Sequence, residues 1–268
     1  MKTVLITGAT DGIGKQTALQ LARHGWRVLL HGRNSQRGEE VVGEILDEMP
    51  HAQVEYLNAD LSSLNEVRQL ARTVLALTPR LDALVNNAGG FFPQRQLSRD
   101  GLEMNFAVNH LAHFLLTNLL LGLLQSSAPA RVVTVSSVIH RNARLNFEDL
   151  QLEQSYNGTR AYATSKLMNV LFAAELARRM EGKGVTSNSL HPGVVATKML
   201  QSAFPSMQGG SPVDGAATSV YLVTSPDVEG VTGKYFENKQ IAPHHPLADD
   251  PEACARLWEI SARLAGVG

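Results

Sequence analysis

The chain has 268 residues, of which 44% are hydrophobic and 18% are charged, and its formal net charge is −1. This composition fits one large α/β domain, and the nearly neutral charge argues against nucleic acid or an anionic membrane surface as a partner. Cys254 is the only cysteine, which excludes a disulfide within the chain and fits a reducing, cytoplasmic compartment.

The sequence predicts no integral membrane segment. The apolar run 4–6 leads directly into Thr7 and Gly8, which leaves no room for the apolar core of a signal peptide. The most apolar stretch, 114–124, is too short to span a bilayer and contains Thr117 and Asn118. We expect it to be a buried or interface helix.

Residues 3–7 are expected to form a buried strand, followed by a glycine-rich turn and a helix that ends near Gly25. Glycines let a backbone approach a pyrophosphate, and a helix N-terminus supplies free N–H groups and partial positive charge. A tight turn without a ligand would use the same glycines, but their place after the first strand favours cofactor binding. The predicted contacts are Gly8, Thr10, Asp11, Gly12, Ile13 and Gly14.

The second strand, 26–31, is followed by Gly32, where a carboxylate that binds a ribose 2′-hydroxyl would be expected. Arg33 comes next, and a guanidinium is well suited to bind a 2′-phosphate. The sequence therefore favours NADP(H) over NAD(H), with Arg33 and Asn34 as cofactor residues. The alternative is a solvated arginine at a strand end.

Two further strand ends carry candidate cofactor residues. After strand 54–58, Asp60 either accepts a hydrogen bond from an adenine amino group or caps helix 64–78, for which Ser62 and Ser63 are also available. After strand 83–85, small residues allow a ribose to approach, although asparagines at such a turn also bond the backbone. The predicted contacts are Asp60, Leu61, Asn87, Ala88 and Gly89.

The residues with acid/base chemistry lie later in the chain. Helix 161–180 carries Tyr162 and Lys166 one turn apart, and a nearby ammonium would lower the pKa of the phenol. Ser137, at the end of strand 131–136, could donate to a substrate oxygen. Asn109, within helix 101–124, either holds a helix irregularity and a water beside the lysine or, as the simpler interpretation, is a plain buried asparagine.

The rest of the chain is expected to complete the site. Residues 1–137 would mainly bind the cofactor, and the segments 138–161 and 198–211 would cover the substrate. The turn after strand 186–190 suits contact with a carboxamide and a pyrophosphate through Pro192, Gly193, Val195 and Thr197. A helix at 214–223, a strand at 234–236 and a helix at 251–264 follow. No metal site is expected at His244 and His245.

Strands alternate with helices throughout and no internal repeat occurs. The predicted architecture is therefore one domain over 1–268, a single doubly wound, Rossmann-like parallel sheet with helices on both faces.

Several motifs together resemble the short-chain dehydrogenase/reductase family: TGATDGIG at 7–14, NADL at 58–61, NNAG at 86–89, YATSK at 162–166 and HPGVVAT at 191–197, with Asn109 and Ser137 between them. NFEDL at 146–150, GKYF at 233–236 and RLW at 256–258 resemble its retinol-dehydrogenase-like branch. That branch handles retinoids, steroids and other apolar carbonyls, commonly with NADP(H). Many of its members carry a leading membrane anchor, whereas this sequence begins at the expected first strand.

The resemblance implies a catalytic set of Asn109, Ser137, Tyr162 and Lys166. Tyr162 would be the general acid/base, Lys166 would lower its pKa and hold the nicotinamide ribose, Ser137 would polarise the substrate oxygen, and Asn109 would hold a water. The resemblance also suggests a homodimer paired through helices 101–124 and 161–180. The alternatives are a dehydratase or epimerase on a related fold and a non-catalytic dinucleotide-binding regulator, which would be expected to lack the tyrosine, lysine or serine.

Overall fold

The computed structural model describes residues 1–203 and 206–267. Its centre is an eight-stranded sheet in the order β3-β2-β1-β4-β5-β6-β7-β8. The strands are β1 (Thr3–Ile6), β2 (Arg27–Gly32), β3 (Val54–Asn58), β4 (Ala83–Asn86), β5 (Ala130–Val135), β6 (Val185–His191), β7 (Tyr235–Glu237) and β8 (Gln240–Ile241). The strand order reverses beside β1, and ligands bind at the carboxyl ends of strands at such a reversal.

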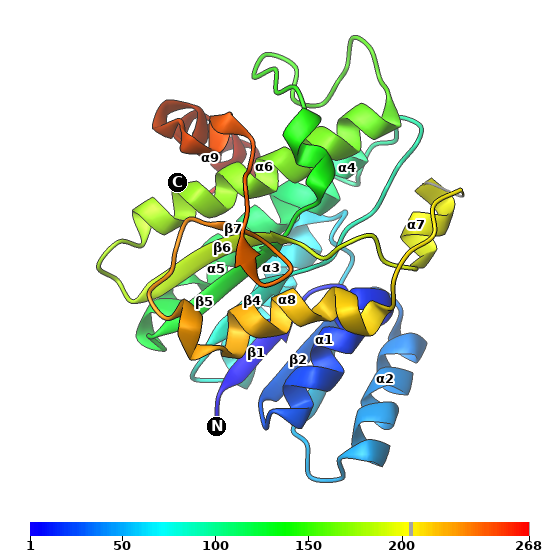
Figure 1. Cartoon of the computed structure of the whole chain (residues 1–268), viewed down its shortest axis with the longest axis vertical. Helices are drawn as coiled ribbons and strands as arrows, with labels where there is room; N and C mark the ends of the chain where they lie inside the picture. The colour runs from blue at the N-terminus through cyan, green and yellow to red at the C-terminus, as the bar shows by residue number, and fades with distance from the viewer. Residues whose placement is uncertain (204–205, 268) are drawn as a thin grey trace.

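Helices cover both faces of the sheet, which confirms the predicted doubly wound α/β fold (Figure 1). They are α1 (Gly12–Arg23), α2 (Ser35–Glu48), α3 (Leu64–Leu77), α4 (Met104–Phe106), α5 (Ala112–Ser126), α6 (Gly158–Arg179), α7 (Lys198–Ala203), α8 (Pro212–Thr224) and α9 (Pro251–Ala265).

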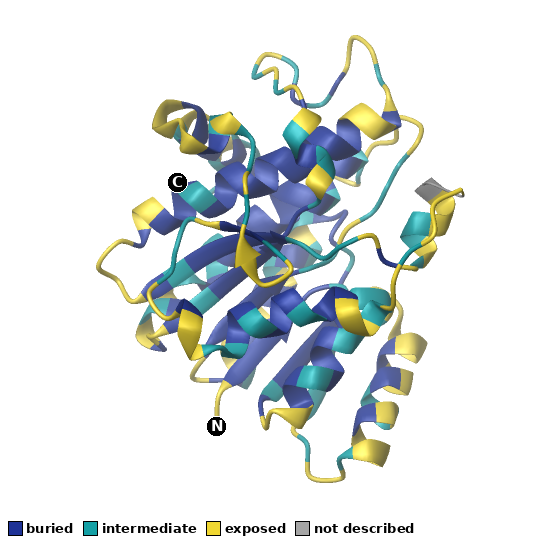
Figure 2. Cartoon of the chain, in the orientation of Figure 1, coloured by how far each residue is buried: buried dark blue, intermediate teal, exposed yellow. Residues whose placement is uncertain are grey.

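The core is divided by the sheet into two layers, and Figure 2 shows the buried residues on the strands and on the helix sides that face them. Alternate residues of a buried strand point to opposite faces. In β1, Leu5 therefore packs with the layer of α3, α5, α6 and α9, while Val4 and Ile6 pack with the layer of α1, α2 and α8.

The sheet departs from the prediction at one edge, because β8 pairs antiparallel with β7. The turn between them uses Asn238 and Lys239, both with positive φ, of 49° and 64°. That backbone suits a two-residue hairpin, for which Asn-Gly is the usual sequence signal. Because Lys239 stands where glycine is usual, the sequence did not predict this hairpin.

The helix predicted at 101–124 is also different. It begins at Met104, after the cap residue Glu103, and it continues to Ser126. Its first turn is followed by a π-helical turn, Ala107–Leu111, with Asn109 at its centre. The helix irregularity expected by one interpretation of Asn109 is therefore present, while the water beside the lysine stays a prediction.

The combined stretch Met104–Ser126 has 23 residues, which by length and composition alone is enough to cross a membrane. The prediction that the apolar stretch is too short to span a bilayer considered only 114–124, whereas the apolar helix extends back to Met104. However, 67% of the most apolar window is buried inside the structure, as expected of the core helix of a globular fold.

Helix α9 packs across α5 and α6, and Trp258 provides its main contact. The Trp258 ring lies 4.8 Å from Phe114 and 5.9 Å from Phe172, between ring centroids, and the Arg179 guanidinium lies 4.4 Å from the centroid of Trp258. This is part of the face through which a homodimer was predicted. The dimer stays a prediction, and a second subunit would have to pack beside α9.

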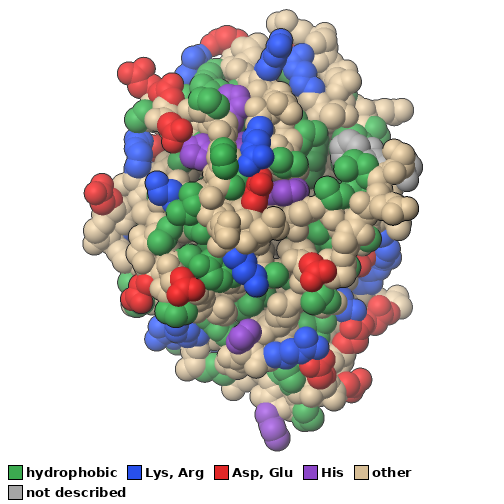
Figure 3. All heavy atoms as spheres, viewed as in Figure 1, with side chains coloured by type: hydrophobic (Ala, Val, Ile, Leu, Met, Phe, Trp, Pro, Cys, Tyr) green, Lys and Arg blue, Asp and Glu red, His purple; other side chains and the backbone are tan. Residues whose placement is uncertain are grey.

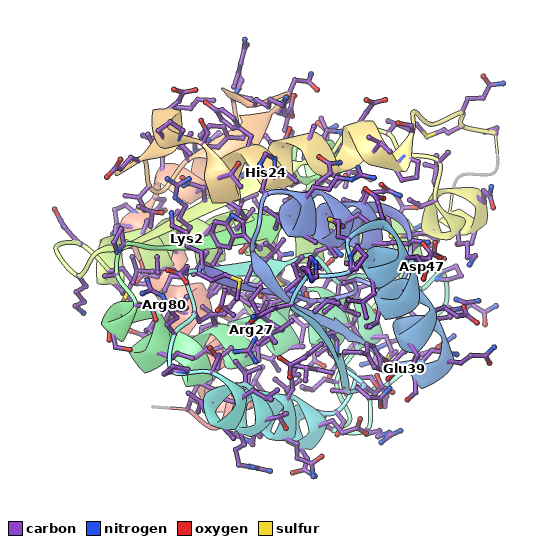
Figure 4. The ribbon with its side chains drawn as sticks, turned by 90° about the horizontal axis from the view of Figure 1, so that it is seen from below. Lys2, His24, Arg27, Glu39, Asp47 and Arg80 are labelled. Atoms are coloured by element: carbon purple, nitrogen blue, oxygen red, sulfur yellow. The ribbon has the colours of Figure 1, made fainter. Side chains whose placement is uncertain are left out.

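Charged residues at the opposite, amino end of the sheet have structural partners. Figure 4 labels Lys2, Arg27 and Arg80 there. Arg27 pairs with Glu55, Arg80 pairs with Asp82, and the Lys2 ammonium lies 5.5 Å from the centroid of the Trp26 ring. On the face shown in Figure 3, basic and acidic side chains are interspersed, without a field of one sign.

Candidate active site

Two adjoining cavities follow the carboxyl edge of the sheet, with volumes of about 300 and about 550 Å³. The smaller cavity lies over β1, β2 and β3, and the larger lies over β5 and β6. Both are lined by Ile13, Asn87, Gly89, Thr197 and Met199.

The glycine turn forms the floor of the smaller cavity. Gly8 and Gly12 have φ angles of 65° and 54°, in the left-handed region that favours glycine. At Gly14 a Cβ would lie only 2.2 Å from the carbonyl oxygen of Gly8, so the turn closes only without a side chain there. Asp11 caps α1 by accepting from the Gly12 N–H at 2.8 Å.

Helix α7 reaches this turn through an ion pair. The Lys198 ammonium lies 2.6 Å from the Asp11 carboxylate, and both side chains are more than half exposed. The hydrogen bond from Lys198 lowers the pKa of Asp11 below its usual value. The Asp11 carboxylate at the N-terminus of α1 is therefore neutralised by segment 198–211, which was predicted to cover the substrate.

Position 32 carries a glycine instead of a carboxylate, and the structure gives a steric reason for this. A Cβ at Gly32 would lie 2.4 Å from Cγ2 of Thr10, so an acidic side chain fits here only if Thr10 moves. Arg33 follows and lines the cavity. Asn34 does not line it, because its side chain caps α2 by accepting from the Arg37 N–H at 2.9 Å.

Asp60 also lines the smaller cavity. Its Oδ1 accepts from the Ser62 N–H at 2.9 Å, while Ser63 is the cap of α3. Of the two roles left open by the sequence, helix capping therefore belongs to Ser63. The other predicted residues on this wall, Leu61, Asn87, Ala88 and Gly89, line the cavity as well.

The larger cavity brings together Ser137, Tyr162 and Lys166, from β5 and α6. The Ser137 side chain acts to lower the pKa of the Tyr162 phenol, so the two groups face each other in this cavity. The Lys166 ammonium lies 5.6 Å from the centroid of the tyrosine ring and donates to the carbonyl of Val135 at 3.2 Å. Pro192, Gly193, Val195 and Thr197 complete the wall, as predicted.

The protonation states of this pair follow from burial. Burial raises the pKa of Tyr162 to about 12, against the lowering effect of the hydrogen bond with Ser137. Burial also lowers the pKa of Lys166 to about 8. The net direction is upward because loss of hydration favours the neutral phenol, and the lowering of this pKa by Lys166 stays a prediction.

Asn109 is fully buried and holds two elements together without lining either cavity. Its side chain accepts from the Gly90 N–H at 2.8 Å and donates to the Gly90 carbonyl at 3.0 Å. It also donates to the Ser165 hydroxyl at 3.0 Å, and that hydroxyl donates to the carbonyl of Tyr162. Asn109 thus fixes the turn after β4 against the helix that carries Tyr162.

The two predicted covering segments contribute unequally. From 138–161, the cavity is lined by Val138, Ile139, Arg141 and Asn142, which form the short 3-10 helix η2 (Val138–Asn142). Later in this segment, the Tyr156 hydroxyl donates to the Phe92 carbonyl at 2.6 Å, and no residue between Asn142 and Tyr162 lines the larger cavity. From 198–211, the larger cavity is lined by Met199, Leu200 and Met207.

Two buried histidines that contact the site were not predicted. His140 donates through Nδ1 to the carbonyl of Ser137 at 2.7 Å and so holds the backbone of a residue that lines the larger cavity. His113 bonds both Asn109 and Thr7. Their only sequence signal is proximity, three residues after Ser137 and four after Asn109, because a buried histidine looks the same whatever it contacts.

Comparisons with known proteins agree on one family. A family model for short chain dehydrogenase matches residues 2–208. The chain is 46% identical to retinol dehydrogenase 14 of Mus musculus, over 99% of this chain and 86% of that protein. It is 43% identical to retinol dehydrogenase 13 of Homo sapiens, over 99% of this chain and 85% of that protein.

Solved structures give the same result. A Mycobacterium paratuberculosis protein superposes with a TM-score of 0.82 at 33% identity, covering 100% of this chain and 94% of that chain. A short-chain dehydrogenase from Escherichia coli, described as complexed with NADPH, has a TM-score of 0.74 at 30% identity and covers 89% of this chain and 97% of that chain.

Proposed function

We propose, from the premise that this chain belongs to the short-chain dehydrogenase/reductase family and to its retinol-dehydrogenase-like branch, that it transfers a hydride between NADP(H) and an apolar alcohol or carbonyl compound. The family makes it an NAD(P)-dependent oxidoreductase acting on CH–OH groups. The preference for NADP(H) and the apolar substrate are the proposal. The observation that carries it is the meeting of Ser137, Tyr162 and Lys166 in the wall of a largely apolar cavity beside the glycine turn.

The residues of the smaller cavity fit a dinucleotide. The glycine turn leaves a surface free of side chains at the N-terminus of α1, where negative charge is favoured. Gly32 leaves space next to Arg33, and this suits the 2′-phosphate of NADP(H). Asp60 and Leu61 would contact the adenine end. The turn Asn87–Ala88–Gly89 and Lys166 would contact the nicotinamide ribose.

When bound, the nicotinamide supplies or accepts the hydride, and the protein is left with proton transfer and orientation. Tyr162 is protonated at neutral pH and would give its proton to the carbonyl oxygen during reduction. Ser137 lines the same cavity as the phenol and would polarise the same oxygen. Lys166, charged below about pH 8, would stabilise the phenolate that the transfer leaves behind.

The lining of the larger cavity supports an apolar substrate. Away from the reacting groups, its wall is made largely of hydrocarbon and thioether side chains, from Val138, Ile139, Val194, Met199, Leu200 and Met207. Methionines adapt to varied apolar shapes, which favours a class of substrates over one compound. The names of the retinol dehydrogenase relatives point in the same direction.

A non-catalytic dinucleotide-binding regulator is the alternative function. No described contact favours it, because the three groups needed for proton transfer meet in one cavity. The cytoplasmic location remains a prediction that subcellular fractionation would test.

The test is a panel of apolar aldehydes, ketones and the matching alcohols, assayed with NADP(H) and NAD(H). We expect turnover with NADPH and an apolar aldehyde or ketone, and a loss of at least about 100-fold in kcat for Tyr162→Phe, in line with the usual contribution of a general acid. Cofactor binding by Tyr162→Phe should stay within about twofold of the wild type, since the phenol hydroxyl alone is removed. Cofactor binding without turnover on any member of the panel would favour the regulator.

A further inference from the structure

The imidazole of His113 lies between the two halves of the site. It is 1% exposed and is the second residue of α5, directly after the π-helical turn. Its Nδ1 lies 3.1 Å from the backbone carbonyl of Asn109, and its Nε2 lies 3.0 Å from the hydroxyl of Thr7. Thr7 directly precedes the glycine turn, 106 residues away in the sequence.

The partners determine which ring nitrogen carries the proton. A carbonyl oxygen can only accept, so Nδ1–H is the donor to Asn109 and Nε2 is an acceptor. The Thr7 hydroxyl therefore donates its single proton to His113, which at 3.0 Å is nearer than its other acceptor, the carbonyl of Val85 at 3.4 Å. Its two lone pairs accept from the N–H groups of Asn87 and Ala88, at 2.9 and 3.0 Å.

This hydroxyl has no capacity left for a further donor. A protonated imidazole would direct a second N–H at an oxygen whose lone pairs are already used. Burial acts in the same direction, since it lowers the pKa of His113 to about 3. The neutral ring is thus held in one tautomer by partners on two separate elements.

Each end of the link reaches residues of the site. At the Thr7 end, Asn87 also donates through Nδ2 to the carbonyls of Thr7 and Gly8, at 2.8 and 3.0 Å, so this end sets the shape of the glycine turn. At the other end, the Asn109 side chain holds the helix that carries Tyr162.

We propose that His113 is a positioning residue that fixes the glycine turn relative to the π-helical turn carrying Asn109, so that the cofactor and the proton-transfer groups meet at the right distance. This inference rests on the proposed function. It predicts that the two hydrogen bonds of the ring have separable consequences, one on cofactor affinity and one on the chemical step.

Two substitutions separate the bonds. In His113→Asn, an amide N–H can replace Nδ1 and keep the bond to Asn109, but nothing reaches Thr7. In His113→Gln, the amide oxygen can replace Nε2 and keep the bond from Thr7, but the donor to Asn109 is lost. His110→Gln is the matched control, because His110 is 1% exposed on the same helical stretch and bonds Ser261 of α9.

We expect His113→Asn to raise the dissociation constant for NADPH by about tenfold while kcat at saturating NADPH stays within about threefold, since the Thr7 hydroxyl keeps only its longer bond to the Val85 carbonyl and this disturbs the cofactor turn alone. His113→Gln should show the reverse, with about tenfold lower kcat and nearly unchanged affinity. His110→Gln should lower thermal stability without moving either constant. Equal effects of the two His113 variants on both constants, or no effect of either, would overturn the proposal.

Binding of NADPH is measured by fluorescence titration and does not require turnover, so it tests His113 even if the proposed reaction is wrong. Should the histidine variants fail to fold, Thr7→Val removes the same hydroxyl from the other side. It is expected to raise the NADPH dissociation constant by about tenfold as well. An unchanged dissociation constant for Thr7→Val would also overturn the proposal.

Discussion

Tyr162 is held as a neutral phenol by its surroundings. Burial favours the uncharged form, and the buried Lys166 ammonium keeps its proton only below about pH 8. In this state the tyrosine is ready to donate a proton, which suits carbonyl reduction near neutral pH. Alcohol oxidation needs the phenolate, which is scarce under the same conditions.

The pH dependence of the two directions should therefore differ. We expect kcat/KM for reduction to be flat near neutral pH and to fall above about pH 8, where Lys166 loses its charge. For oxidation it should rise by about tenfold per pH unit through the neutral range, because the phenolate fraction rises by that factor. Initial rates in both directions at saturating cofactor would check this. An oxidation rate that is already maximal at neutral pH would contradict a neutral Tyr162.

Arg33 decides cofactor preference if it binds the 2′-phosphate. Arg33→Asp should lower the ratio of kcat/KM for NADPH to that for NADH by at least about tenfold, because a charge-assisted pair is replaced by repulsion. Arg23→Asp makes the same charge change at the far end of α1, where Arg23 pairs with Glu48, and should leave the ratio unchanged. If both variants changed the ratio equally, the cause would be the net charge of the protein and not binding of the 2′-phosphate by Arg33.

At the scale of elements, the turn after β4 depends on close packing against α5 and α6. A Cβ at Gly89 would lie 3.2 Å from Oδ1 of Asn109 and 3.4 Å from the Lys166 ammonium. The Asn109 Oδ1 atom cannot move away easily, because it accepts from the Gly90 N–H at 2.8 Å. The absence of a side chain at position 89 therefore keeps the asparagine and the lysine in place.

Gly89→Ala should lower kcat by about tenfold, since sub-ångström displacement of positioned groups is costly in catalysis. Gly43→Ala is the control, because a Cβ there meets nothing within 4 Å and the residue lies within helix α2. It should raise the free energy of unfolding by about 0.5–1 kcal/mol and leave kcat unchanged. A Gly89→Ala enzyme with full activity would show that the turn tolerates the displacement.

At the scale of the whole molecule, buried histidines set the response to acid. Burial lowers the pKa of His31, His110 and His140 to about 4 and that of His113 to about 3. In the unfolded chain they would titrate near their ordinary pKa of about 6.5. Below that pH the unfolded state binds more protons than the folded state, so stability falls as the pH falls towards about 4.

Each such histidine contributes up to about 1.4 kcal/mol per pH unit in this window, or about 6 kcal/mol per pH unit for the four together. We therefore expect a steep loss of thermal stability between about pH 6.5 and 5, measurable by calorimetry or fluorescence. His110→Gln should reduce the slope by about one proton. A melting temperature that stays constant over this range would contradict the neutral state of these four histidines.

The sequence by itself determined what depends on local order and chemistry. Alternating apolar strands and helices give the doubly wound sheet, and the glycine turn identifies the edge where a cofactor fits. The spacing of Tyr162 and Lys166 on one helix brings both to the cavity that Ser137 reaches from β5. These features follow from periodicity and from residue types at strand ends, which a single sequence displays directly.

Only the tertiary structure decided what depends on neighbours distant in the sequence. It gave the pKa of Tyr162 its direction, because burial by many segments favours the neutral phenol. It made Asn34 a helix cap, centred the π-helical turn on Asn109, and joined His113 to Thr7 across 106 residues. Desolvation and long-range hydrogen bonds are set by the packing of separate elements, and they leave no periodic trace in the order of the residues.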